Sequence, residues 1–209
     1  MDMMQWLIGH QHKLKRVAAF GGTNIFSPKK APAKYCHECR IANTCRYHDQ
    51  AGFVFPVRGP LPIHHRNQKT YGGDLCVYNA EKDICDNMTA IFEWDSGIRG
   101  NFNLQLFQAD GCRVTKIWGE NGLVEFRDGK ITIIESPRGH RHEITPKGYA
   151  GGHGGSDPQM IGNFIDAIEG KKSDSSLEAG LAAAILTLKA EEAMMTGKVL
   201  EIDPKLYKV

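Results

Sequence analysis

Residues 88–135 constrain the fold more than any other part of this 209-residue chain. Apolar and polar side chains alternate along 88–95 and, after a turn at Asp95-Ser96-Gly97, along 98–106. A period of two buries one face of a β-strand and leaves the other to water or to another protein surface. Further short runs follow, and Asp128-Gly129 is a strong signal for a tight hairpin turn. The stretch predicts an antiparallel meander of five strands.

Two helical patterns follow the meander and supply the cover that its apolar face needs. The first occupies 158–169, and the second is the alanine-rich stretch 177–196. The predicted fold is therefore α+β, a two-layer, mostly antiparallel open sheet with helices packed on one face, in a single domain of residues 1–209. The apolar stripes expected on the two helices are Ile161, Phe164, Ile165 and Ile168, and Leu177, Leu181, Ala184, Ile185 and Leu188.

The N-terminal part of the chain predicts a short helix and a strand. Residues 2–9 place Met4, Leu7 and Ile8 on one helical face, with Gly9 where a C-terminal cap belongs. Two turns of helix are unstable in isolation, so we expect this segment to dock on the body of the protein. A strand is expected within 15–26.

Charge and hydropathy exclude several classes of partner. The net charge is +2 and the isoelectric point is near 8.2, which is too balanced to indicate a nucleic-acid or membrane-surface partner. No apolar run approaches the roughly 18 residues of a membrane span, and no secretory signal opens the chain. We therefore expect no membrane association and a cytoplasmic location, in which cysteines are thiols or metal ligands.

The irregular segment 27–72 contains a cluster of potential metal ligands. Cys36, Cys39, Cys45 and His48 follow the spacing C-x2-C-x5-C-x2-H. Thiolate and imidazole groups suit tetrahedral zinc, and a metal would order a loop that has little core of its own. A structural zinc site, a disulfide and a set of inert thiols are all compatible with the pattern.

Two shorter segments carry polar residues of interest. A glycine-rich loop, 151–155, surrounds His153 and leads into Asp157-Pro158, which is a typical helix N-cap followed by proline. The loop matches neither the dinucleotide fingerprint nor the P-loop. Asp83 and Asp86 stand before the meander, where we expect them to be solvated.

Several of these segments resemble parts of the C-terminal domain of one family, the glucose-fructose oxidoreductase and inositol dehydrogenase family (Gfo/Idh/MocA). The segments occur in the same order along the chain as in that domain. Residues 2–9 resemble the end of the family's His-Asp-x-Asp-x-x-x-Trp-Leu-x-Gly helix. The other similar segments are Val17-Ala18-Ala19-Phe20-Gly21-Gly22, Cys76-Val77-Tyr78 with Asp83 and the meander, Gly151-Gly152-His153-Gly154-Gly155, and the last helix ending Thr196-Gly197-Lys198-Val199.

The resemblance implies a role as part of a larger enzyme. Family members begin with a Rossmann domain that binds NAD or NADP and carries a catalytic lysine in Glu-Lys-Pro, and neither motif occurs here. The family's active-site histidine would precede Met1, so this chain is expected to be an isolated domain, a proteolytic fragment or a split reading frame, inactive alone. The substrate-binding residues implied are Asp2, His153 and Asp157, with no catalytic or cofactor-binding residue in this chain.

The same resemblance implies the partners. The substrate would be a sugar, a cyclitol such as inositol, or a related polyol, and the chain would form a homo-oligomer through its sheet. The polar row Arg99, Asn101, Asn103 and Gln105 is expected to meet the second copy. The alternative is a free-standing, metal-stabilised dimeric binding or scaffold module.

Overall fold

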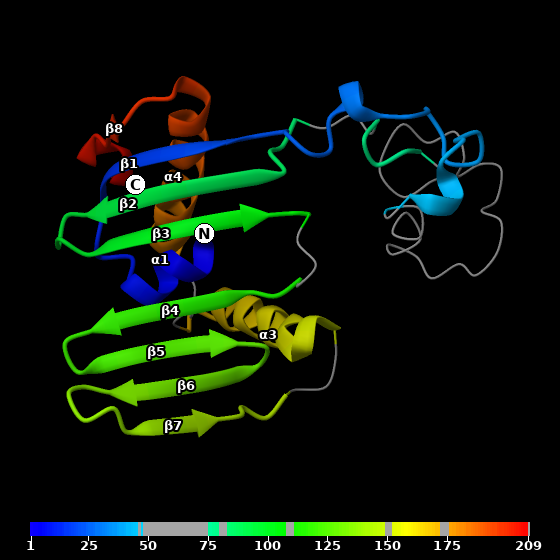
Figure 1. Cartoon of the computed structure of the whole chain (residues 1–209). Coiled ribbons are helices and arrows are strands. Elements are labelled where there is room, and N and C mark those ends of the chain that lie inside the picture. Colours follow the sequence, from blue (N-terminus) through cyan, green and yellow to red (C-terminus); the bar gives the residue numbers. More distant parts are fainter. Residues whose placement is uncertain are drawn as a thin grey trace. The chain divides into compact units, whose positions relative to one another are not determined.

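A computed structural model describes residues 1–45, 47, 75–79, 83–107, 111–148, 152–171 and 176–208 (Figure 1). Within these residues, helices accompany two antiparallel sheets of four strands each, which confirms the predicted α+β class. The chain divides into two compact units. One consists of Met1–Phe107 and Leu177–Val209, and the other of Gln108–Ser176.

The first unit is built on a sheet with the strand order β3-β2-β1-β8. Its strands are β1 (Leu14–Gly22), β2 (Asn87–Trp94), β3 (Arg99–Gln105) and β8 (Leu200–Glu201), and every neighbouring pair is antiparallel. The turn predicted at 95–97 joins β2 to β3, with Gly97 at φ 81°. Strands β1 and β2 pair along their whole length although a long segment separates them in the sequence.

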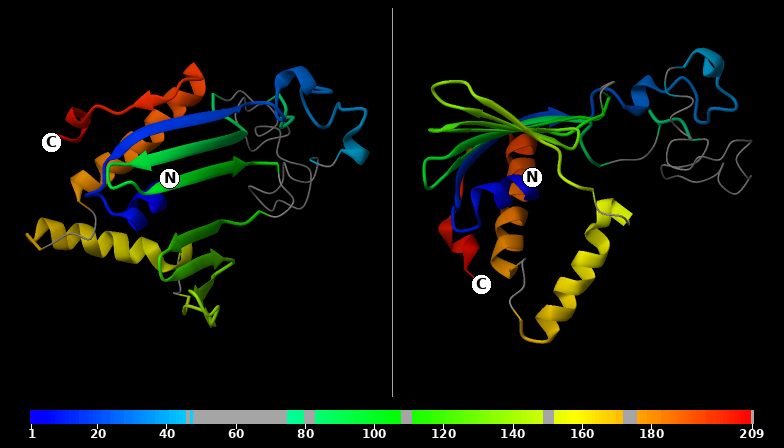
Figure 2. Two further views of the ribbon diagram at one scale, coloured as in Figure 1. Left: turned by 60° about the vertical axis from the view of Figure 1, so that its left-hand side comes forward. Right: turned by 90° about the horizontal axis from the view of Figure 1, so that it is seen from below.

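The core of this unit lies between one face of the sheet and α4 (Leu177–Thr196), as both views in Figure 2 show. Alternate residues of β1 and β2 point to the helix, as the period of two predicts. The cluster of buried side chains consists of Leu14, Val17, Ala19, Met88, Ala90, Phe92, Trp94, Ile185, Leu186, Ala190, Ala193 and Ile202.

The buried face of α4 matches the predicted stripe only in part. Ile185 is buried and Leu181 packs against the core, as predicted, but Leu177 and Leu188 are exposed. Leu186, Ala190 and Ala193, which were not in the stripe, are fully buried. Apolar residues surround much of this helix, so periodicity alone selected the face only approximately. The helix approaches the sheet closely at Gly21, where a Cβ atom would lie 2.8 Å from the Sδ atom of Met194. The same Cβ atom would lie 2.5 Å from the carbonyl oxygen of Asn87 on the neighbouring strand.

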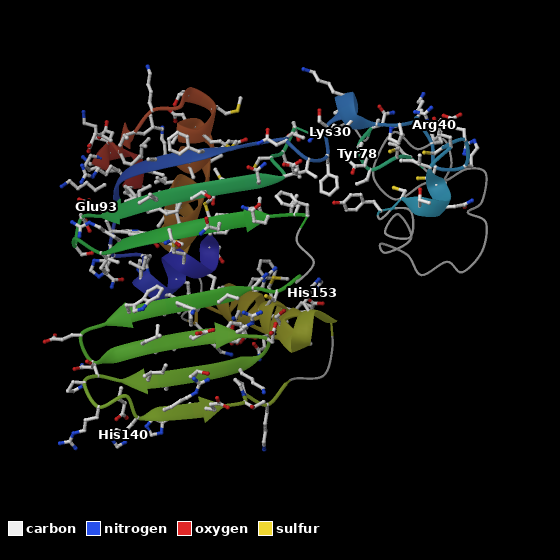
Figure 3. The ribbon with its side chains drawn as sticks, in the orientation of Figure 1. Lys30, Arg40, Tyr78, Glu93, His140 and His153 are labelled. Atoms are coloured by element: carbon white, nitrogen blue, oxygen red, sulfur yellow. The ribbon has the colours of Figure 1, made fainter. Side chains whose placement is uncertain are left out.

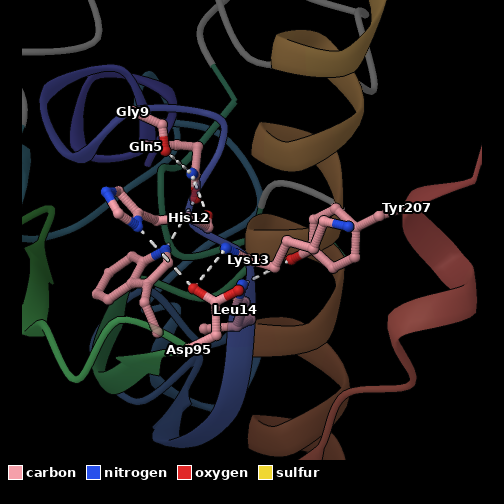
Figure 4. A network of polar contacts seen from close by, with 8 residues as sticks. Gln5, Gly9, His12, Lys13, Leu14, Asp95 and Tyr207 are labelled. Carbon is pink, nitrogen blue, oxygen red and sulfur yellow. Dashed lines mark hydrogen bonds and ion pairs between the residues drawn. The ribbon is translucent and has the colours of Figure 1, made fainter.

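Helix α1 (Asp2–Ile8) docks on this unit through a buried glutamine (Figure 4). The side-chain amide of Gln5 donates to the carbonyl oxygens of Gly9 and His12, each at 3.0 Å, and its oxygen accepts from the indole nitrogen of Trp94 at 3.1 Å. Met4 and Ile8 pack against the core, as the predicted docking requires, while Leu7 is exposed. The buried amide thus satisfies both the helix end and the indole.

The segment between β1 and β2 is closed at its base by Asp86, which is only 1% exposed. Its carboxylate accepts from the backbone nitrogens of Asn24 at 3.0 Å, Ile25 at 2.8 Å and Phe26 at 2.7 Å. It also accepts from the side-chain amide of Asn87 at 2.8 Å. Solvation, which the sequence suggested for this residue, is therefore wrong.

The ionised form of Asp86 is favoured despite its burial. Desolvation by itself would raise the pKa of this carboxyl group, but the hydrogen bonds from Phe26, Asn87, Asn24 and Ile25 together outweigh it. The net effect lowers the pKa of Asp86 below its ordinary value. The carboxylate of Asp86 is thus held by three consecutive backbone N–H groups, an arrangement that stabilises anions in proteins.

Beyond the hydrogen bonds to Asp86, the described part of the cysteine-containing segment is short and irregular. It contains the 3₁₀ turns η1 (Pro28–Lys30) and η2 (Ala42–Thr44) and one antiparallel bridge between Tyr35 and Leu75. The rings of Phe26, Tyr47 and Tyr78 contact one another, with centroid distances of 5.2, 5.8 and 5.7 Å. This aromatic cluster packs together residues from both ends of the segment that the structure describes.

The second unit contains the other sheet, with the strand order β4-β5-β6-β7. Its strands are β4 (Val114–Gly119), β5 (Gly122–Arg127), β6 (Lys130–Glu135) and β7 (Arg141–Ile144). The hairpin predicted at Asp128-Gly129 joins β5 to β6, and both turn residues have positive φ, 50° and 74°. The run 88–135, predicted as one meander, is therefore divided between two sheets.

The helical part of this unit is α3 (Ser156–Ile168), preceded by the 3₁₀ turn η4 (Gly152–Gly155). The predicted apolar stripe is present, but Ile161, Phe164, Ile165 and Ile168 are all exposed. Shortly after the end of α3, Gly170 adopts a φ of 76°. None of the helices in the described part of the chain is long and apolar enough to cross a membrane.

Asp86→Ala is expected to lower the free energy of unfolding by about 3 kcal/mol, because it leaves buried backbone N–H groups without an acceptor. The exposed neighbour Asp83 offers a matched control, and Asp83→Ala should change stability by less than about 0.5 kcal/mol. Urea unfolding followed by circular dichroism measures both. Equal stabilities of the two variants would contradict the structural role of Asp86.

The stability contributed by Asp86 should depend on pH in a defined direction. Because folding lowers its pKa, the carboxylate stabilises the fold above the unfolded-state value of about 3.9, and this contribution is lost as the pH falls through the folded-state value. The wild type should therefore exceed Asp86→Asn in stability by a constant margin at neutral pH, and the margin should shrink below about pH 4. A margin that is the same at acidic and neutral pH would disprove this.

Candidate functional site

The candidate site of the second unit is a histidine–aspartate pair at the start of α3. The Nδ1 atom of His153 lies 2.9 Å from Oδ1 and 3.1 Å from Oδ2 of Asp157. The histidine side chain is 83% exposed and the aspartate side chain 45%. Figure 3 labels His153 on the turn that leads into the helix. The structure therefore brings together two of the three residues predicted to bind substrate.

The backbone around the pair explains its geometry. His153 adopts φ 51°, a left-handed conformation that is uncommon for residues other than glycine, and Gly155 follows with φ 88°. The hydroxyl group of Ser156 donates to the carbonyl oxygen of His153 at 2.9 Å. This compact turn directs the imidazole ring back to the first turn of α3.

Asp157 is not the N-cap that the sequence predicts. Helix α3 begins at Ser156, its N-cap is Gly155, and no side chain makes a capping hydrogen bond. Asp157 instead lies in the first turn, where its negative charge is favourable to the helix dipole. Because the turn at Gly155 starts the helix two residues earlier than expected, the carboxylate is available to His153.

Asp2, the third predicted substrate-binding residue, belongs to the other unit. It is exposed in the first turn of α1. It corresponds to the second aspartate of the motif that the segment 2–9 resembles. Its role in substrate binding stays a prediction.

The predicted metal ligands are only partly within the described residues. Cys36, Cys39 and Cys45 are half-buried, and His48 lies outside the described part of the chain. Among the residues that the structure describes, no three or more histidine, cysteine, aspartate or glutamate side chains are grouped to hold a metal ion. The backbone nitrogen of Cys39 donates to the carbonyl oxygen of Cys36 at 3.1 Å, a tight turn of the kind expected for C-x2-C. The four-residue zinc site stays a prediction.

The face of the first sheet opposite α4, which we call the open face, carries the polar row predicted to meet a second copy. Its β3 residues Arg99, Asn101, Asn103 and Gln105 are all exposed. Two large apolar side chains, Phe20 and Ile91, are exposed on the neighbouring strands β1 and β2. A mixed surface of this kind has the composition of a wet protein interface.

A network of charges occupies one end of the open face. Glu93, labelled in Figure 3, accepts two hydrogen bonds from the guanidinium group of Arg16, at 2.8 and 3.2 Å. These bonds are the main reason that the pKa of Glu93 lies below its ordinary value, and they raise the pKa of Arg16. Lys15 and Arg99 lie 3.7 and 3.5 Å from the same carboxylate. Three cations thus surround the Glu93 carboxylate, and a second carboxylate, Glu201, lies opposite Arg16 on β8.

Sequence reasoning missed Gln5 and Asp86, the buried polar residues of the first unit, and the contribution of Ser156 to the turn before α3. Gln5 stands among apolar helix residues and had no distinguishing signal. Asp86 directly precedes a strand, and its neighbour Asn87 was the only local hint of a hydrogen-bonding cluster.

Comparisons with known proteins agree on the type of protein. No protein-family model matches the chain. YteT of Bacillus subtilis (strain 168), named as an oxidoreductase, is 25% identical over 187 residues, covering 77% of this chain and 43% of that protein. The chain thus spans less than half the length of this relative.

Solved structures extend the similarity to nearly the whole chain. An oxidoreductase domain protein from Kribbella flavida gives a TM-score of 0.60 at 13% identity, covering 97% of this chain and 47% of that one. Levoglucosan dehydrogenase with NADH and levoglucosan gives 0.58 at 12% identity, covering 96% and 47%. The WlbA dehydrogenase from Chromobacterium violaceum gives 0.52 at 16% identity, covering 97% and 43%.

The fold is that of the Gfo/Idh/MocA-type oxidoreductases. This confirms the resemblance predicted from the sequence. The matched region is the C-terminal part of those proteins, as the order of the sequence motifs predicted.

Proposed function

We propose that this chain is the substrate-binding and oligomerisation domain of an NAD(P)-dependent oxidoreductase that acts on a sugar, a cyclitol or a related polyol. The observation that carries the proposal is the match of nearly the whole chain to less than half of dehydrogenases such as levoglucosan dehydrogenase, which is described with NADH and levoglucosan. WlbA is described with NADH and a nucleotide sugar, UDP-GlcNAcA, and aldose-aldose oxidoreductase from Caulobacter crescentus with glycerol. These ligands share the hydroxylated carbon skeleton of a polyol.

In this proposal the cofactor performs the redox chemistry and the chain positions the alcohol. When bound by the complete enzyme, a nicotinamide cofactor would take up the hydride of the carbinol carbon and a base outside this chain would take up the hydroxyl proton, while residues of this chain orient the hydroxyl groups around that carbon. His153 and Asp157 provide polar groups at an exposed turn, and Asp2 contributes a further carboxylate from α1. Sugar recognition uses such groups because each hydroxyl can both donate and accept a hydrogen bond.

The exposed stripe of α3 supports a role within a longer protein. A 13-residue helix with no buried residue leaves most of its apolar side chains in contact with water. Isolated helices of this length are marginal in water, so contacts with a further surface would stabilise it. The Kribbella flavida protein and levoglucosan dehydrogenase are each about twice as long as this chain, and in the proposed complete enzyme the corresponding remaining part provides that surface.

The open face provides the surface for a second copy. Phe20 and Ile91 are exposed at its centre, and the charged residues around Glu93 lie at one end. Burying large apolar side chains is favourable by roughly 25 cal/mol per Å² of area, and the flanking polar residues give the contact its register. A homo-oligomer is therefore proposed together with the substrate-binding role.

The proposal also includes a cytoplasmic location and a zinc ion bound by the cysteine-containing segment.

The complete reading frame that contains this chain should reduce NAD or NADP in the presence of at least one member of a panel of sugars, cyclitols and polyols. NAD(P)H fluorescence measures the reaction. His153→Ala should lower kcat/KM by about tenfold, the value of one hydrogen bond to substrate, and leave the melting temperature nearly unchanged. His140→Ala, which alters another exposed histidine of the same unit, is the control. Absence of turnover with the whole panel would overturn the proposed function, and an unaltered His153 variant would overturn the site.

The 209-residue chain should form a homo-oligomer at micromolar concentration, and Ile91→Lys should dissociate it by placing an unpaired charge in the interface. Ile84→Lys is the matched control, because Ile84 is 62% exposed and Ile91 60%, but Ile84 lies outside the strands of the sheet. Sedimentation velocity measures the assembly state. A monomeric wild-type chain, or dissociation by the Ile84 variant alone, would argue against an interface on the open face.

A further inference from the structure

We propose that Asp157 is a positioning residue, which holds the imidazole of His153 with its proton on Nδ1 and leaves Nε2 as a hydrogen-bond acceptor for a substrate hydroxyl group. The choice of a hydroxyl as ligand rests on the proposed function. The arrangement of the two side chains does not, because it follows from the distances in the second unit.

The chemistry of the two side chains fixes the direction of the hydrogen bond between His153 and Asp157. An ionised carboxylate has only acceptor atoms, and both oxygens of Asp157 lie within 3.1 Å of Nδ1 of His153. The ring nitrogen must therefore supply the proton. In a neutral imidazole only one nitrogen carries a proton, and the partner of the other nitrogen decides which one it is. Nδ1–H facing Asp157 leaves a lone pair on Nε2.

The edge of the imidazole ring that does not face Asp157 is open to solvent. Asp157 occupies the inner side of the pair, with 45% of its side chain exposed, while 83% of the His153 side chain is exposed. Since Nδ1 is turned to the carboxylate, the opposite edge of the ring, with Nε2, faces solvent. Within the part of the chain that the structure describes, the ring makes hydrogen bonds only through Nδ1, so an incoming hydroxyl group can reach Nε2.

The turn that carries His153 is held by hydrogen bonds to both its backbone and its side chain. The backbone of His153 is held on its other side by Ser156, whose hydroxyl group donates to the His153 carbonyl oxygen at 2.9 Å. With φ at 51°, His153 has a backbone conformation that costs energy for a residue with a Cβ atom. A turn fixed at both its carbonyl and its side chain gives Nε2 a defined position for an acceptor.

Stability alone does not account for the pair. Exposed ion pairs contribute between zero and roughly 1 kcal/mol, because water and salt screen them. Removal of the Asp157 carboxylate should therefore change the protonation pattern of the ring far more than the stability of the fold. A capping role would give the opposite result, but Asp157 does not cap α3.

The test measures which nitrogen of His153 carries the proton. Long-range ¹H–¹⁵N correlation spectra of the ¹⁵N-labelled chain, recorded about two units above the ordinary histidine pKa of about 6.5, distinguish the two neutral tautomers. The His153→Gln variant assigns the signals by their loss. We expect the Nδ1–H tautomer to predominate in the wild type and the Nε2–H tautomer to predominate in Asp157→Ala.

Ser156→Ala is the matched control, because Ser156 contacts the backbone of His153 and not its ring. This variant should keep the wild-type tautomer. Asp157→Asn provides a second reading if the alanine variant fails to fold, and it should lower the Nδ1–H fraction because a neutral amide is a weaker acceptor than a carboxylate. A wild-type ring that is mainly Nε2–H, or a tautomer that neither Asp157 variant alters, would overturn the inference.

A kinetic double-variant cycle separates this inference from the proposed function. In the complete enzyme, Asp157→Ala should lower kcat/KM by up to about tenfold, and adding it to His153→Ala should cause no further loss. Independent, additive losses would show that Asp157 acts apart from His153. If the complete protein oxidises no member of the panel, the proposed function fails, while the tautomer measurement still decides the role of Asp157.

Discussion

The closure made by Asp86 is the constraint on which the first unit depends. Gly22 and Asn87 lie side by side at the ends of β1 and β2, yet they are 65 positions apart in the sequence. The entropy of closing a loop rises only slowly with its length, so a long segment can be tolerated if its two ends are held firmly. A buried carboxylate with several N–H donors holds them, and it also fixes Phe26, from which the aromatic cluster of the cysteine segment begins.

The periodic parts of the fold could be predicted from the sequence because their signals are local. Alternation identified β2 and β3, and Asp128-Gly129 identified the hairpin because both residues must adopt positive φ. Strand β7 carried no such signal and was not predicted. The division into two sheets could not be predicted, since β3 and β4 show strand signals of the same local kind and pairing depends on distant parts of the chain. Likewise, the buried face of α4 depends on the residues of β1 and β2 that it packs against, which lie far away in the sequence.

The candidate site shows the same limit at the scale of single side chains. The glycine-rich loop pointed to His153, and the following Asp157-Pro158 pointed to a helix start. The pairing of the two residues depends on the left-handed conformation of His153 and on a helix that begins at Ser156. Neither is encoded in residue type alone, because the N-cap preference of aspartate and the conformational freedom of Gly155 compete for the same turn.

Asp86 and Asp157 carry the same functional group, and burial decides what each one does. Asp86 is inaccessible to water, so every donor that faces it must be retained and its loss exposes unsatisfied N–H groups in the interior. Asp157 is nearly half exposed, so water can replace it as the partner of the His153 ring at little cost to stability. Its consequence is confined to the one group that it orients, the imidazole of His153. The exposed carboxylate therefore acts through the side chain that it contacts, while the buried carboxylate acts through the backbone groups that it accepts from.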